Sequence, residues 1–232
     1  MNRTGSRGRA SRSPLVKIFS GRFSLLLVSI VFAFALCPFL DGFVRMQMLT
    51  DIYLTAILLA AIQAVCDRRR SFLIALALAL PYIVLKWSGF AAGASLAWHL
   101  EELFGAFFVA YVLGFILSFI VRQHRVTTDV IMAAVCGYFL LGLMWAFVYF
   151  FVEAALPGSF QLALGASDVS ANFIYFSFVT LTTVGYGDVL PLSNAARSLA
   201  VLEAVMGQLY LAVTIARLVG IQASQAQADG HE

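Results

Sequence analysis

The chain has 232 residues, of which 62% are hydrophobic and only 12% are charged, and its formal net charge is +3. Soluble domains average about 45–50% apolar and about 25% charged residues, so this composition excludes an ordinary soluble protein and indicates an integral membrane protein. The basic residues gather at the N-terminus and in short loops, which favours a topology signal over a nucleic-acid surface. The cysteines have no metal-ligand spacing and are expected to be small buried hydrophobes; they are Cys37, Cys66 and Cys136.

The first half of the chain is predicted to form four membrane helices. Residues 1–22 combine basic residues with Ser and Gly, which predicts a disordered cytoplasmic segment. The first apolar run, 23–40, is expected to be an uncleaved span rather than a signal peptide, because no convincing cleavage site follows it. The next three runs cover 48–65, 71–87 and 94–121. Together these runs predict a four-helix membrane domain over 23–125.

The second half alternates long and short apolar segments. These segments cover 130–152, 171–182 and 194–219. The middle one is too short to span a bilayer, which takes about 20 residues, so it is expected to be a re-entrant helix between two spans. We expect a second unit over 126–220 and a short cytoplasmic tail over 221–232.

The charged loops predict the orientation of the chain. Basic loops alternate with neutral or acidic ones along the sequence. Six spans then satisfy the positive-inside rule with both termini in the cytoplasm. The expected location is the cell membrane, as a multi-pass protein.

The most informative stretch is the nine residues from Thr180 to Asp188, TLTTVGYGD. Gly185 and Gly187 stand at alternate positions and can adopt the positive φ angles that other residues resist. Alternating handedness would turn successive carbonyls to the same side of an extended strand. A ring of such strands would stack rings of backbone oxygens, each able to replace part of the water shell of a cation.

This stretch resembles the selectivity-filter signature of potassium channels, T-x-x-T-x-G-[YF]-G-D, and the loop TVGYG is the established example of a potassium filter. The resemblance implies that the carbonyls of Thr183, Val184, Gly185 and Tyr186, with the Thr183 hydroxyl, bind K+, and that Gly187 forms the outer exit. Potassium would be the permeant ion, with no cofactor. One strand cannot surround an ion, so four chains must converge in a homotetramer within the bilayer. The implied fold is an all-α integral membrane protein with six transmembrane helices, a re-entrant pore helix and a filter, in the tetrameric cation-channel architecture.

The resemblance also implies residues that support the filter. Tyr175 stands where many potassium channels have a pore-helix Trp, and its hydroxyl would reach Asp188. Phe176 occupies the next aromatic-cuff position and would pack near Tyr186. Thr180 either supports the filter or packs at the helix end.

Two residues of the last span are candidates for a role in gating or conduction. Gly207 matches the glycine hinge of many inner helices, but a small residue also allows close helix packing. Glu203 is an intramembrane acid, for which a functional role is the default expectation. It would either bond pore-helix hydroxyls such as Ser177 or Thr180, face the central cavity, or be a protonated structural carboxyl.

The fourth apolar run carries no Arg or Lys, whereas a voltage sensor needs several basic residues there. We therefore expect little voltage dependence. Glu101 and Glu102 could sense extracellular protons or cations, but a solvated pair at the membrane interface is favoured.

The leading prediction is thus a potassium-selective channel that conducts passively. The alternatives are a subunit of a potassium uptake system and a non-conducting or regulatory subunit that keeps the pore fold. An enzyme is not expected, because the sequence has no metal cluster, nucleophile–base set or phosphate loop.

Overall fold

The computed structural model describes residues 21–40, 46–65, 69–88, 95–162 and 169–229. Within these ranges the elements are α2 (Ser24–Leu40), α3 (Met46–Val65), α4 (Arg69–Ser88), α5 (Ser95–Arg122), α6 (Thr128–Ala155), β1 (Phe160–Gln161), α7 (Val169–Leu181), β2 (Leu190–Pro191) and α8 (Asn194–Asp229). Most of the expected disordered segment 1–22 lies outside the described residues, as do Cys66 and the side chain of Cys37.

Five helices, α3, α4, α5, α6 and α8, are long and apolar enough to cross a membrane. Helix α2 has 17 residues, at the lower end of the range of about 17–25 residues that a span requires. Helix α7 has only 13 residues, in agreement with the expectation that it does not span. Five of the six predicted spans therefore have the required length and composition, and a sixth span at α2 stays a prediction.

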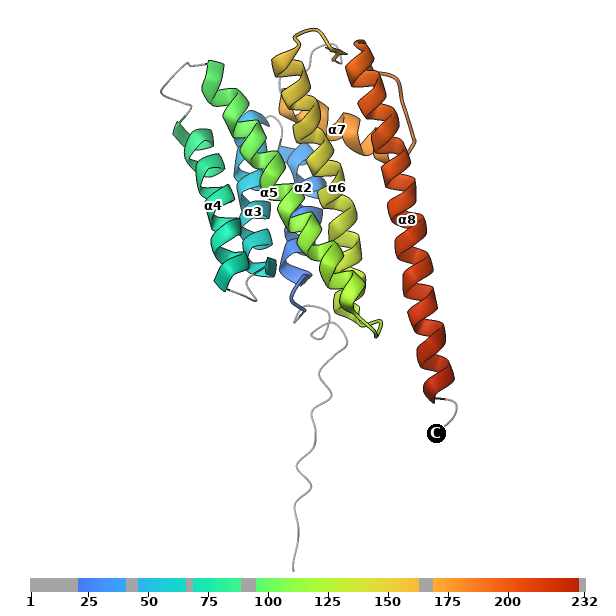
Figure 1. Cartoon of the computed structure of the whole chain (residues 1–232). Helices are drawn as coiled ribbons and strands as arrows, with labels where there is room; N and C mark the ends of the chain where they lie inside the picture. The colour runs from blue at the N-terminus through green and yellow to red at the C-terminus, as the bar shows by residue number, and fades with distance from the viewer. Residues whose placement is uncertain (1–20, 41–45, 66–68, 89–94, 163–168, 230–232) are drawn as a thin grey trace, which may run out of the picture.

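The long helices run roughly side by side, with α2 to α5 on one flank and α8 at the other edge (Figure 1). Helix α5 packs along α6, and α7 packs against both α6 and α8. The start of α2 and the end of α8 are the first and last helix ends that the structure describes. Both lie toward the same end of the molecule (Figure 1). This agrees with an even number of spans.

Helix α6 lies at the centre, with half of its residues buried, because it contacts α2, α5, α7 and α8. On its α7 side an aromatic cluster forms from Tyr149, Phe160, Phe173 and Phe176, whose ring centroids lie 5.0 to 5.6 Å apart in the contacts they share. The antiparallel β1–β2 pair, in which Phe160 faces Pro191, brings the segment before α7 next to the segment that follows residues 180–188. Residues 180–188 are called the filter stretch below, after the resemblance described above.

One helix is longer than the sequence predicted. Helix α8 continues to Asp229, ten residues beyond the expected end of the last span at Val219. The added turns begin with Gly220, which disfavours a helix, but the Ala and Gln residues after it are good helix formers and no proline follows. Helix α4 runs unbroken through Pro81.

Candidate functional site

Backbone hydrogen bonds attach the filter stretch to the C-terminal end of α7. The amide of Thr183 donates to the Thr180 carbonyl at 2.9 Å. The amides of Val184 and Gly185 both donate to the Val179 carbonyl, at 2.9 and 3.3 Å. These bonds occupy carbonyls that a helix end otherwise leaves unpaired, and they attach the stretch to the helix. Thr180 thus contributes through its backbone.

Backbone handedness alternates along the stretch. Gly185 and Gly187 have φ angles of +58° and +80°, as the sequence predicted, and Thr183 also has a positive φ, of +61°. The conformation at Thr183 was not predicted, because a β-branched residue resists it at a cost of about 1–2 kcal/mol. Positive φ therefore recurs at every second residue, which is the alternation that turns successive carbonyls toward one side.

The stretch is exposed in the isolated chain. Residues 182–188 all fall in the exposed class, with the Tyr186 side chain 73% and that of Val184 53% accessible. The described part of the same chain therefore leaves the side chains of this stretch uncovered.

Tyr175 links α7 to the far end of the stretch. Its hydroxyl donates a 2.8 Å hydrogen bond to a carboxylate oxygen of Asp188, and its ring stacks on that of Tyr186 with the planes 3° apart. The bond to Asp188 raises the pKa of the Tyr175 phenol to about 12, so the donor keeps its proton near neutral pH. The second Asp188 oxygen accepts from the Val189 amide at 3.1 Å.

Phe176 does not pack near Tyr186 in this chain, which corrects the expectation from the resemblance. Its described ring partners are Tyr149 and Phe160, on the α6 side of α7. Successive helical residues point about 100° apart, so when Tyr175 faces the filter stretch its neighbour must turn away from it.

Glu203 is fully buried between α6, α7 and α8. Its two carboxyl oxygens lie 2.5 Å from the hydroxyls of Ser177 and Tyr149, and Ser177 Oγ also lies 2.7 Å from the Gly142 carbonyl. A hydroxyl has one proton, so both Ser177 contacts are satisfied together when the Glu203 carboxyl supplies the second proton. Of the predicted alternatives, the bond to Ser177 is present and the bond to Thr180 is not among the described contacts.

Gly207 lies where α8 meets the end of α7. A Cβ atom added there would lie 2.7 Å from both the Leu181 carbonyl oxygen and its Cδ1 atom. Helix α8 continues without a break through this position. The geometry therefore favours close packing over a hinge as the reason for glycine in this conformation.

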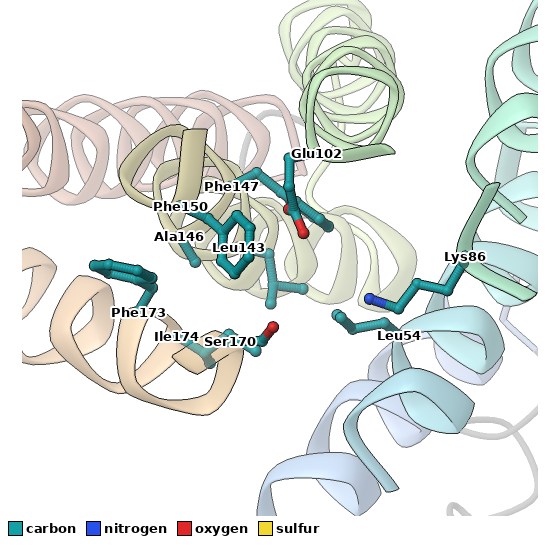
Figure 2. Close-up of a pocket in the computed structure, with 10 residues that line it drawn as sticks. All are labelled: Leu54, Lys86, Glu102, Leu143, Ala146, Phe147, Phe150, Ser170, Phe173 and Ile174. Carbon is teal, nitrogen blue, oxygen red and sulfur yellow. The ribbon is translucent and has the colours of Figure 1, made fainter. Parts of the chain in front are cut away.

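A largely buried ion-pair cluster connects helices α3, α4 and α5 near α7. Lys86 Nζ lies 2.9 Å from Asp51 Oδ1 and 2.8 Å from Glu101 Oε1. Glu102 is buried and, with Lys86 and Ser170, lines a cavity of about 20 Å³, enough for one water molecule (Figure 2). The expectation of a solvated Glu101–Glu102 pair was wrong, because Glu101 pairs with Lys86 of α4 and Glu102 is buried at a cavity lined mainly by α6 and α7.

The ion pairs of Lys86 were not predicted from the sequence. The available signal is a lysine in the last turn of an apolar run, with acidic residues near the matching ends of the neighbouring runs.

The chain resembles known proteins mainly over its second half. A family profile described as an ion channel matches residues 126–222. Two pore potassium channel c from Oryza sativa subsp. japonica is 35% identical over 81 residues, covering 35% of this chain and 17% of the rice protein. Protein LctB from Geobacillus stearothermophilus is 30% identical over 119 residues, covering 47% of this chain and 88% of LctB, and Protein LctB from Bacillus caldotenax is 29% identical with the same coverage. The chain thus spans less than a fifth of the rice protein and most of each LctB protein.

Proposed function

Because the chain belongs to the ion-channel family, we propose that it is a potassium-selective channel that conducts K+ passively through a homotetrameric pore. The observation that carries this proposal is the recurrence of positive φ at Thr183, Gly185 and Gly187 in an exposed stretch attached to the end of α7. Four copies of this stretch would bring their carbonyls around one axis.

The proposed ion sites use backbone oxygens. The carbonyls of Thr183, Val184, Gly185 and Tyr186, with the Thr183 hydroxyl, replace water around K+, and Gly187 forms the exit. Helix α7 points its C-terminal end, where helices carry partial negative charge, at the base of this stretch, which stabilises a cation there. Tyr175 and Asp188 hold the outer end of the filter at a fixed distance from α7.

The four-helix domain is proposed to anchor the pore without acting as a strong voltage sensor. Helix α5 has one described basic residue, Arg122, and it stands at the last position of the helix. A residue at the membrane boundary moves little charge through the field. In the proposed topology both termini lie in the cytoplasm of a cell whose plasma membrane holds the channel.

The test is ion flux into liposomes that contain the purified full chain, with opposed K+ and Na+ gradients. The wild-type protein should pass K+ and exclude Na+, and Gly185→Ala should abolish this flux. Gly158→Ala is the matched control, because Gly158 has a φ of +83° and a side chain there would meet nothing within 4 Å, outside the filter stretch. Equal flux of both ions would contradict selectivity. Absence of flux from a stable tetramer would favour the non-conducting subunit.

A further inference from the structure

A groove runs along the C-terminal half of α5, beside the start of α4, at the end of these helices away from α7; we call it the α4–α5 groove. Its volume is about 610 Å³, and its polar end is formed by Ser71, Arg122 and Gln123. Its apolar part includes Gly114, Phe115 and Phe119. Gly114 lies on open space, since a Cβ atom there would meet nothing within 4 Å.

The polar end of the groove is positively charged. Arg122 is exposed and forms no ion pair with any residue that the structure describes. The guanidinium of Arg22 lies 5.3 Å from the centre of the Phe115 ring, but its Nε donates to the Ala64 carbonyl and it does not line the groove. Arg69 and Arg70 are exposed immediately before Ser71. None of the described residues that line the groove is acidic.

We propose that the α4–α5 groove binds an anionic phospholipid, whose phosphate lies at Arg122 and whose acyl chain follows the surface at Gly114, Phe115 and Phe119. The groove combines an apolar floor with a cationic end at the boundary of two membrane-length helices, where a lipid has its headgroup. The positive-inside rule assigns this end to the cytoplasmic leaflet, where anionic lipids attract basic residues. A water-soluble anion would have no use for the apolar floor.

The site adjoins a contact between the two halves of the chain. The Arg217 guanidinium of α8 donates to the carbonyls of Ile120, Val121 and Gln123 at the end of α5. Gln123 belongs both to this contact and to the groove. A headgroup at Arg122 therefore lies beside the contact that joins α5 to α8.

The test is native mass spectrometry of the detergent-purified full chain with added phosphatidylglycerol or phosphatidylcholine. The wild-type protein should retain phosphatidylglycerol in preference to phosphatidylcholine. Arg122→Gln should weaken phosphatidylglycerol binding about fivefold, which corresponds to about 1 kcal/mol per basic residue at an anionic surface. Gly114→Leu fills the floor and should reduce the binding of both lipids.

Arg125→Gln is the matched control, because Arg125 is exposed three residues away and does not line the groove. It should leave lipid retention within twofold of the wild-type value. Equal retention of the two lipids by the wild-type protein would overturn the proposal without any variant. An equal loss in both arginine variants, or displacement of the lipid by excess inorganic phosphate, would also overturn it.

Discussion

The buried contact between Tyr149 and Glu203 supports a quantitative prediction. Both side chains are fully buried, and their oxygens lie 2.5 Å apart, so the hydroxyl cannot be replaced by water without a rearrangement. Tyr149→Phe removes one donor to a buried carboxyl group and leaves that acceptor unpaired. Loss of such a partner lowers the free energy of unfolding by about 1–3 kcal/mol.

Tyr138→Phe is the matched control, because it removes the same atom from the same helix. The Tyr138 hydroxyl is only partly buried and makes a longer bond, 3.3 Å, to the neutral Leu181 carbonyl. Its loss should cost about 0.5–1 kcal/mol, near the lower end for a single hydrogen bond.

The assay is thermal unfolding of each purified variant in one detergent, followed by circular dichroism. Tyr149→Phe should lower the midpoint clearly more than Tyr138→Phe. Adding Glu203→Gln to Tyr149→Phe should cost less than the sum of the single changes, because both alter one interaction. An equal effect of the two tyrosine variants, or full additivity in the double variant, would refute the assignment of Glu203 to a structural network.

Three other changes test the remaining contacts. Gly207→Ala should destabilise the protein by about 1–3 kcal/mol, because its methyl group would collide with the last turn of α7. Gly220→Ala is the control, because its methyl group would meet nothing within 4 Å, and equal unfolding midpoints of the two variants would contradict the packing role. Tyr175→Phe removes the hydrogen bond to Asp188 and should lower the K+/Na+ permeability ratio in bilayer recordings, whereas Tyr175→Trp retains a donor and should keep the ratio near the wild-type value. Unchanged currents in the Phe variant would show that the bond from Tyr175 to Asp188 does not support the filter stretch. Lys86→Met leaves two largely buried carboxylates without their cation and should lower the free energy of unfolding by about 3–5 kcal/mol. The loss is measured from the shift in unfolding midpoint, and a loss under about 1 kcal/mol would show that the ion pairs are solvated.

The order and type of the elements could be predicted from the sequence because hydropathy governs membrane proteins directly. A bilayer requires long apolar helices, and a short apolar segment before a glycine-rich stretch has few other arrangements. A short helix was expected over 171–182 and is found over 169–181, and the positive φ angles of Gly185 and Gly187 also followed from these constraints.

Side-chain neighbours were harder to predict because they depend on how each helix is rotated. Tyr175 and Phe176 are adjacent in sequence, but one contacts Asp188 and the other enters the aromatic cluster on α6. Hydropathy does not distinguish these two faces of α7, since both are apolar. The three-helix contact at Lys86 likewise depends on the relative depth of α3, α4 and α5, which run lengths fix only to within a turn.

The central claim is selective conduction of potassium, and the most direct measurement is the reversal potential of the purified protein in a planar bilayer with K+ on one side and Na+ on the other. The account predicts a reversal potential displaced strongly toward the value for a pure K+ current, and a loss of this displacement in Gly185→Ala. A reversal potential near zero in the wild-type protein would contradict the account, because it would show that the stretch 183–187 does not discriminate between the two ions.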